Sequence, residues 1–305
     1  MQSGEGLKPI GAAMWKVLLS MRYLQADETK VKILQPEKTG YLWGYYTPLL
    51  GKGFVVFEIA TTRRGSVAEE RLKDFKGLLQ TDGYAAYLKL KKRYGITGLS
   101  CLSHARRKFD EVFKSSKNTQ GIAAEFIARV KPLYALESRM RDLEVSFHTR
   151  KRLRLKYALP VLKELRAWLK QQKVPPNSKL ADAIRYFLEQ YRYLIIYTHH
   201  GMAEINTNLL ENQNRLVACG RKNWMFVGNK DSGEISALWY SIVATALLNG
   251  LNPRLYIHFL LTKVHELRKG LIDPMTLLPH IIDHQILLDF ANEQVALARQ
   301  VLDST

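Results

Sequence analysis

Three acidic side chains at widely separated positions could carry metal-dependent chemistry. Asp27 lies in a β-prone run, Asp82 ends another, and Glu211 lies in a helix-like segment. Two magnesium ions held close together can clamp a phosphodiester and activate an attacking oxygen. Because Mg²⁺ takes oxygen ligands and keeps several waters, three carboxylates from different elements are a sufficient set.

Each carboxylate also has an ordinary structural explanation. Asp27 fits the exposed end of a strand, and Asp82 fits an Asx turn. Asn208 and Glu211 have the spacing of a capping box, while Glu211 and Arg215 have that of an i,i+4 helical ion pair. The residues alone leave these alternatives open, because short motif matches carry a high false-positive risk.

Basic residues gather at two places where they could contact a polyanion. The first group lies at the start of a predicted helix. These residues could contact DNA or could belong to an ordinary solvent-exposed face, and the sequence leaves both alternatives open. The second lies around and beyond Glu211, where cations beside an aromatic ring favour phosphate contact with base stacking over a core tryptophan with solvated neighbours. The candidates are Arg106, Arg107 and Lys108 in the first group, and Arg215, Arg221, Lys222 and Trp224 in the second.

Cys101 and His104 have the spacing of two metal ligands, but no second pair lies nearby in the sequence. A cysteine at the end of an apolar strand is usually a core residue. Only Cys101 and Cys219 are present, which excludes a disulfide framework and a zinc finger built on four clustered ligands. A structural metal is therefore not expected.

The composition favours a globular chain with a polyanionic partner. Its 305 residues are 47% hydrophobic and 24% charged, with a net charge of +18 and a pI near 9.8. Such a basic balance, spread along the chain in short runs, points first to nucleic acid. No apolar run is long enough for a membrane span and no signal peptide is visible, so we expect a cytoplasmic protein without a membrane partner.

The elements that must position these residues begin with a strand-rich half. β-branched and aromatic runs between Gly and Pro turns predict an antiparallel meander of three strands, followed by alternating helices and strands. The predicted strands cover 23–34, 40–47, 54–59, 78–82 and 96–101, with helices over 66–75 and 84–94 between the later ones. This order is typical of an α+β core.

Helices dominate the rest of the chain. Amphipathic periodicity predicts helices over 121–144, 155–172 and 180–197, a block that looks inserted between the strands and Glu211. The segment 208–228 predicts a helix that stops at Gly220, then a short strand over 224–227. Further helices are predicted over 234–249 and 253–268, with two short ones around 277–280.

Several motifs in this order resemble the transposase of the insertion sequence 66 family, from about residue 10 to the end. They are Gln25–Leu34, Leu79–Tyr87, Cys101–Phe109, Ala183–Tyr186 and Gly220–Gly228, with Thr245–Pro253 and Leu277–His280 resembling its C-terminal elements. The resemblance implies a DDE transposase with a ribonuclease H-like mixed sheet, an α-helical insertion and a helical C-terminal region. It marks Cys101 and His104 as a family motif without assigning them a chemical role.

The resemblance also implies the roles of the site. Asp27 would bridge two Mg²⁺ or Mn²⁺ ions, and Asp82 and Glu211 would each hold one. The chemistry would be nicking at a transposon end and attack of the freed 3′ hydroxyl on target DNA. The implied partners are transposon-end and target DNA, further copies of the chain on DNA, and accessory proteins of the same element.

The expected domain organisation has five segments. The segments are an N-terminal helical remnant over 1–23, two halves of the catalytic core over 24–104 and 204–250, the helical insertion over 105–203, and a helical region over 251–305.

The family's usual Ile-Asp-Asn-Asn reads Ile205-Asn-Thr-Asn208 here, and its usual N-terminal regions are not seen. The alternatives are therefore a truncated copy that only binds DNA, and a structure-selective nuclease.

Overall fold

The computed structural model describes residues 2–84, 87, 89–90 and 95–303, which form two compact units. Residues 1–75 and 210–305 build the first, which we call the discontinuous unit. Residues 76–209 build the second, the inserted unit. The chain combines many helices with antiparallel and parallel strand pairs, so the predicted α+β class with mixed strand pairing is confirmed.

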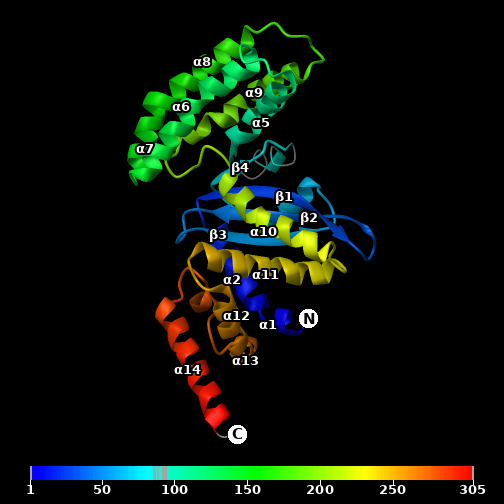
Figure 1. Ribbon diagram of the computed structural model, residues 1–305, viewed down its shortest axis with the longest axis vertical. Helices are drawn as coiled ribbons and strands as arrows, with labels where there is room; N and C mark the ends of the chain where they lie inside the picture. Colours follow the sequence, from blue (N-terminus) through cyan, green and yellow to red (C-terminus); the bar gives the residue numbers. More distant parts are fainter. Residues whose placement is uncertain (1, 85–86, 88, 91–94, 304–305) are drawn as a thin grey trace. The chain divides into compact units, whose positions relative to one another are not determined.

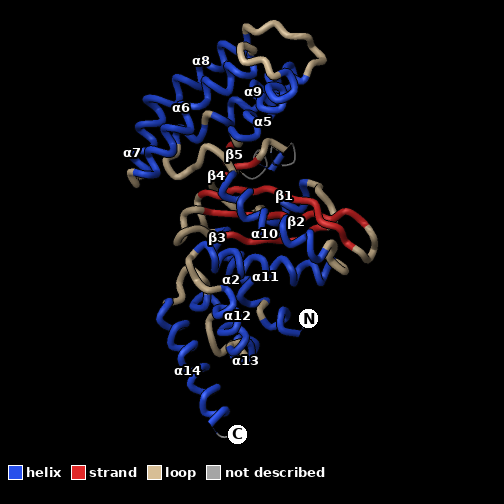
Figure 2. The backbone as a smooth tube through the Cα atoms, in the orientation of Figure 1, coloured by secondary structure: helices blue, strands red, loops and turns tan. Residues whose placement is uncertain are grey.

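Three antiparallel strands form the centre of the discontinuous unit (Figure 2). They are β1 (Tyr23–Ile33), β2 (Lys38–Thr47) and β3 (Phe54–Ala60), close to the predicted ranges. The long apolar run of β3 is buried except at Glu58, as its composition requires. In the register, Asp27 of β1 faces Gly44 of β2.

Helix α11 (Lys230–Leu248) lies along β3 (Figure 1). Its side chains form hydrogen bonds with the backbone of this strand. Ser241 Oγ accepts the amide of Phe57 at 2.8 Å. Thr245 Oγ1 accepts the amide of Val55 at 3.2 Å and donates to the carbonyl of the same residue at 2.9 Å. Polar side chains of a helix therefore take the place of a neighbouring strand.

Asn249, directly after α11, continues this series. Its Nδ2 donates to the carbonyl of Gly53 at 3.0 Å, and its Oδ1 accepts the amide of Lys52 at 3.3 Å. Four residues of a helix advance by about 6 Å and two residues of a strand by about 6.7 Å, so positions 241, 245 and 249 keep step with β3. The open edge of this strand is closed without a further strand.

Several further helices belong to the discontinuous unit. They are α1 (Gln2–Gly6), α2 (Lys8–Leu19), α3 (Gly65–Arg71), α12 (Pro253–Thr262), α13 (Val264–Arg268) and α14 (His284–Asp303), with the 3₁₀ turn η3 at Pro274–Leu277. Helix α2 buries Ile10, Met14 and Leu18. Among the described residues, every helix is too short or too polar to cross a membrane.

The inserted unit joins a parallel strand pair to a group of helices. The pair is β4 (Leu78–Thr81) and β5 (Thr97–Ser100). The helices are α5 (Leu102–Ser116), α6 (Ile122–Asp142), α7 (Phe147–Leu153), α8 (Leu159–Lys170) and α9 (Lys179–Leu194), with a π-helical turn η1 at Arg154–Ala158 and a 3₁₀ turn η2 at Ile196–His199. The helix predicted over 84–94 lies largely outside the described residues.

Arg154 is the buried centre of these helices. Its guanidinium pairs with both carboxylate oxygens of Glu137, at 2.6 and 2.8 Å, and donates to the carbonyl of His200 at 2.8 Å. A buried charge is tolerated only when it is paired and hydrogen-bonded in this way. The helix predicted over 155–172 begins as the π-helical turn that carries Arg154 and continues directly as α8.

The predictions of a helix stop at Gly220 and a strand over 224–227 are wrong. Helix α10 continues from Asn208 to Trp224, and only Val227 forms an isolated parallel bridge, to Ile33. Gly220 serves close packing instead of a C-cap, since a Cβ there would overlap the hydroxyl of Tyr240. Tertiary packing therefore overrides the local stop signal.

The contact between α11 and β3 gives a first prediction. Thr245→Val keeps the shape of the side chain but leaves the buried amide and carbonyl of Val55 without their partner, so we expect a loss of about 1–3 kcal/mol in the free energy of unfolding. Thr262→Val is the matched control, because Thr262 Oγ1 donates only to its own helix, at the carbonyl of Phe259. Urea denaturation of both variants measures the difference, and equal losses would contradict this role of Thr245.

Candidate functional site

Asp27 lies in the middle of β1, half-buried, with helix α10 packed over it. Its Oδ2 accepts a hydrogen bond from Asn214 Nδ2 at 3.0 Å. One turn earlier on α10, the amide of Leu210 donates to Gln25 Oε1 at 3.3 Å. These two bonds attach the first turns of the helix to β1.

Gly44 allows this close approach. A Cβ at this position would lie 2.9 Å from Asn214 Oδ1, 3.0 Å from a ring carbon of Phe57 and 3.1 Å from a methyl of Leu210. Since Gly44 faces Asp27 across the strand pair, a side chain there would push α10 away from the carboxylate. The pairing of Asp27 with Asn214 thus depends on a missing side chain.

Glu211 lies in the first turn of α10 and is half-buried. It precedes Asn214 by three residues, so the two share a helix face. The amide of Asn208, which a capping box would direct to Glu211, donates instead to Asn206 Oδ1 at 3.0 Å. Asn206, where the family pattern has an acid, therefore accepts a hydrogen bond in front of the helix.

Asp82 belongs to the inserted unit and directly follows β4. Its Oδ1 accepts the amide of Tyr84 at 2.9 Å, so the Asx turn considered from the sequence is present. Within the described part of the chain, Oδ2 has no hydrogen-bond partner. The turn fixes one carboxylate oxygen and is compatible with a ligand at the other.

Tyr186 of α9 holds the backbone of the same turn, because its hydroxyl donates to the carbonyl of Asp82. Burial and the nearby Asp82 raise the pKa of this hydroxyl, which keeps it protonated and able to donate. Gly83 has a φ of +92°, and a Cβ there would meet Gln190 of α9 at 2.7 Å. Helix α9 therefore shapes the turn that presents Asp82.

A cavity of about 270 Å³ lies beside Asp82, within the inserted unit. Arg107 and Lys108 from α5 bring two cations to its wall, and the Lys108 ammonium lies 4.9 Å from the centre of the Tyr186 ring. Arg and Lys side chains are common partners of backbone phosphates. The other residues that line it are Gly83, Tyr84, His104 and Glu111.

Arg106 differs from its two neighbours. Its guanidinium carbon lies 5.6 Å from the centre of the Tyr134 ring, and its Nε lies 3.5 Å from Asp110 Oδ2. These contacts hold Arg106 against its own unit. Of the first predicted basic group, Arg107 and Lys108 are thus the two that face the cavity beside Asp82.

Cys101 is fully buried at the start of α5. Burial raises the pKa of its thiol, but the hydrogen bond and charge of His104, together with the amide of Thr207, outweigh this effect and bring the pKa below its usual value. Cys101 Sγ accepts the Thr207 amide at 3.3 Å. The thiol therefore ties the start of α5 to the segment that leads into α10.

The second basic group is divided between packing and solvent. Arg221 donates to the carbonyl of Lys30 in β1. Trp224 Nε1 donates to the hydroxyl of Tyr240 at 2.8 Å, which gives the indole a partner within the unit. Arg215 and Lys222 are exposed on α10.

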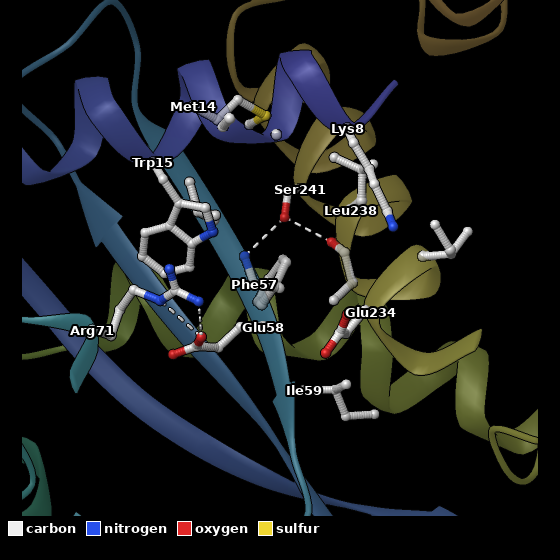
Figure 3. A pocket seen from close by; sticks show the side chains of 15 residues that line it. Lys8, Met14, Trp15, Phe57, Glu58, Ile59, Arg71, Glu234, Leu238 and Ser241 are labelled. Atoms are coloured by element: carbon white, nitrogen blue, oxygen red, sulfur yellow. Dashed lines mark hydrogen bonds and ion pairs between the residues drawn. The ribbon is translucent and has the colours of Figure 1, made fainter. Parts of the chain in front are cut away.

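Another cavity, of about 280 Å³, lies between α2, β3 and α11 (Figure 3). Glu58 on its wall binds Arg71 through Oε2 at 2.7 and 2.8 Å, and its Oε1 accepts the hydroxyl of Tyr45 at 3.0 Å. The Arg71 guanidinium stacks 4.2 Å from the centre of the Trp15 ring. Glu58 and Arg71 therefore neutralise each other on this wall, while Lys8 and Glu234, which also line the cavity, pair with Glu5 and Lys230.

The structure thus places Asp27 and Glu211 on adjoining elements of the discontinuous unit and Asp82 in the inserted unit. Asn214 and Tyr186, which contact two of these carboxylate residues, are not found by sequence reasoning about chemistry. Asn214 had one signal, its i,i+3 spacing from Glu211, and Tyr186 had another, its place in the motif Ala183–Tyr186.

Comparison with known sequences identifies one family. Residues 1–235 match the family described as Transposase IS66 family. Over 290 residues the chain is 31% identical to uncharacterized protein y4jD of Sinorhizobium fredii, covering 90% of this chain and 56% of that protein. Uncharacterized proteins y4hP and y4qI of the same organism are 26% identical over 266 residues and 30% over 259. These alignments cover 80% and 79% of this chain, and 48% and 47% of those proteins. The chain therefore spans about half the length of the curated relatives it matches.

The contact between Asn214 and Asp27 gives a second prediction. Asn214→Ala removes a hydrogen bond to a carboxylate, for which we expect a loss of about 1.5–3 kcal/mol in the free energy of unfolding. Asn212→Ala on the exposed face of α10 is the control, with an expected change within about 0.5 kcal/mol. Chemical denaturation measures both, and an Asn214→Ala variant as stable as the control would refute the contact.

Proposed function

This chain belongs to the IS66 family of transposases, and from that premise we propose that it cleaves DNA strands and joins them by a DDE mechanism that uses two divalent metal ions. The observation that carries the proposal is the pairing of α10 with β1. It sets Glu211 on the helix face that also contacts Asp27, two of the three carboxylates on which such a mechanism relies.

The donor set fits magnesium or manganese. Asp27, Asp82 and Glu211 offer carboxylate oxygens, the ligands that these hard cations prefer. Asp27, Asp82 and Glu211 would together hold the two ions. When bound, the ions would supply charge for the phosphate oxygens and activate the attacking hydroxyl.

The protein's own side chains would orient these carboxylates and the DNA. Asn214 fixes one oxygen of Asp27, and the Tyr84 amide fixes one oxygen of Asp82. Arg107 and Lys108, on the wall of the cavity beside Asp82, would hold a backbone phosphate there. Positioning of this kind accounts for much of the catalysis in phosphoryl transfer.

The reaction would have two steps on the same carboxylates. In the first, water attacks a phosphodiester at the transposon end and releases a 3′ hydroxyl. In the second, that hydroxyl attacks a phosphodiester of the target and displaces a 3′ oxygen, so one bond forms as another breaks. Further copies of the chain on the DNA and accessory proteins of the element are proposed partners.

The third prediction tests the catalytic claim. Wild-type protein is incubated with Mg²⁺ or Mn²⁺ and a pre-nicked duplex that carries the end sequence of its own element, and joined products are measured on a denaturing gel. Asp82→Asn and Glu211→Gln should each reduce joining at least about a hundredfold, because a lost ligand removes several kcal/mol of transition-state stabilisation.

The control for this experiment is Asp142→Asn, which neutralises an exposed carboxylate at the end of α6 in the inserted unit and should leave joining unchanged. Joining that is equal in wild type and Asp82→Asn would reject the mechanism. If the wild type and all variants bind DNA but join none, the protein only binds DNA. Cleavage without joining would favour a structure-selective nuclease.

The fourth prediction concerns Tyr186 as a positioning residue for Asp82. Tyr186→Phe removes the hydroxyl bound to the Asp82 carbonyl but keeps the ring beside Lys108. We expect kcat for joining to fall about 3- to 10-fold, as for a lost hydrogen bond, with KM for DNA unchanged. Tyr191→Phe on the same helix is the control, and an effect on KM instead of kcat would assign Tyr186 to DNA binding.

A further inference from the structure

The segment directly after α10 exposes the side chains of Met225 and Phe226 to solvent. Before them, Trp224 is anchored to Tyr240, and after them Val227 is anchored to β1. The Val227 amide donates to the carbonyl of Lys32 at 2.9 Å, and its carbonyl accepts the amide of Leu34 at 2.9 Å. The chain between these two anchors is therefore short and fixed at both ends.

Met225 and Phe226 lie between the anchors and point into solvent. Their side chains are 66% and 41% exposed, whereas Val227 beside them is 7% exposed. Met225 has a φ of +58°, a left-handed conformation that is unfavourable for a residue with a side chain and persists only where the surroundings impose it. The anchored turn thus holds two adjacent apolar side chains in solvent, where they offer a small apolar surface to a partner.

Cations lie beside Met225, the neighbour of Phe226 in the chain. Met225 lines a groove of about 440 Å³ together with Lys30, Lys32, Lys38 and Arg221. The three lysines are exposed. The groove also contains one carboxylate, Glu37, which pairs with Lys32 at 2.8 Å. The remaining positive charge gives the groove the character of an anion-binding surface.

We propose that this groove binds DNA at a place where bases are unpaired, with Phe226 and Met225 packed on the exposed base faces and Lys30, Lys38 and Arg221 on the adjoining phosphates. The proposal rests on the proposed function, because strand transfer requires distorted DNA ends to be held. We call Met225 and Phe226 the wedge.

The chemistry of the ligand follows from the combination of groups. A fully paired duplex offers phosphates but hides the faces of its bases, so it would use the cations and leave the wedge in water. An unpaired base offers a flat apolar face close to its own phosphate, and aromatic side chains stack on such faces whatever the base. Apolar side chains inserted between base steps serve the same purpose in proteins that kink DNA.

The test compares two fluorescently labelled duplexes of one sequence, one fully paired and one with a short mismatched bubble. Fluorescence anisotropy of the full chain without divalent metal gives the dissociation constants, so that no reaction occurs. We expect the wild type to bind the bubble about tenfold more tightly than the paired duplex, as stacking on one base provides. Phe226→Ala and Met225→Ala should lose this preference while keeping their affinity for the paired duplex.

Matched variants separate the parts of the groove. Phe226→Trp keeps an aromatic face and should retain the preference. Lys38→Ala should weaken binding of both duplexes equally and lower the salt dependence by about one ion. Leu271→Ala, which truncates a side chain that is 71% exposed elsewhere in the same unit, should change neither affinity. Circular dichroism confirms that each variant is folded.

Equal affinity of the wild type for both duplexes would overturn the proposal, as would a preference that survives in Phe226→Ala and Met225→Ala. Binding to vesicles of phosphatidylserine and phosphatidylcholine that Phe226→Ala abolishes, without a preference between the duplexes, would assign the wedge to a membrane surface instead. Because Asp82→Asn should keep the preference for the bubble, the wedge and the catalytic proposal can fail independently. A protein that binds neither duplex would defeat both.

Discussion

The contact of α11 with β3 is the constraint on which the discontinuous unit depends. A strand edge left open would present unpaired amides and carbonyls, and here Ser241, Thr245 and Asn249 take them up at a spacing that the helix and the strand nearly share. The strand is thereby committed to one position along the helix. β3 pairs with β2 and β2 with β1, and the register of this second pair places Asp27 opposite Gly44.

The part of the candidate site in the discontinuous unit depends on how α10 packs against β1 and β2. Gly44 leaves room for α10, and Asn214 and Leu210 attach the helix to β1 beside Asp27. In the inserted unit, Tyr186 and Gln190 of α9 shape the turn after β4 that carries Asp82. In both units, residues from a helix fix the backbone or carboxylate that would do the chemistry, so side chains without a chemical role of their own determine the geometry.

Much of the fold follows from local patterns. The five strands form close to their predicted ranges because runs of β-branched and aromatic residues between turns are a local signal, and the elements that carry Asp27, Asp82 and Glu211 are those expected. The end of α10 is different, because packing against Tyr240 carries the helix through Gly220. Asn214 with Asp27, and Tyr186 with Asp82, are 187 and 104 residues apart, and no periodicity in one sequence joins such pairs. The catalytic roles remain predictions.

Cys101 and Leu102 hold together the two ends of the long helical segment that separates β5 from α10. Leu102 N donates to the carbonyl of Ile205 at 3.1 Å, and Thr207 N donates to Cys101 Sγ, so the chain leaves and returns at the same place. The entropy of closing this loop is therefore met by contacts within the inserted unit. Because these contacts hold its two ends together, the segment of about a hundred residues between Cys101 and Thr207 connects β5 to α10 as a short loop would. Insertions or deletions within it would therefore cost the remaining fold little free energy.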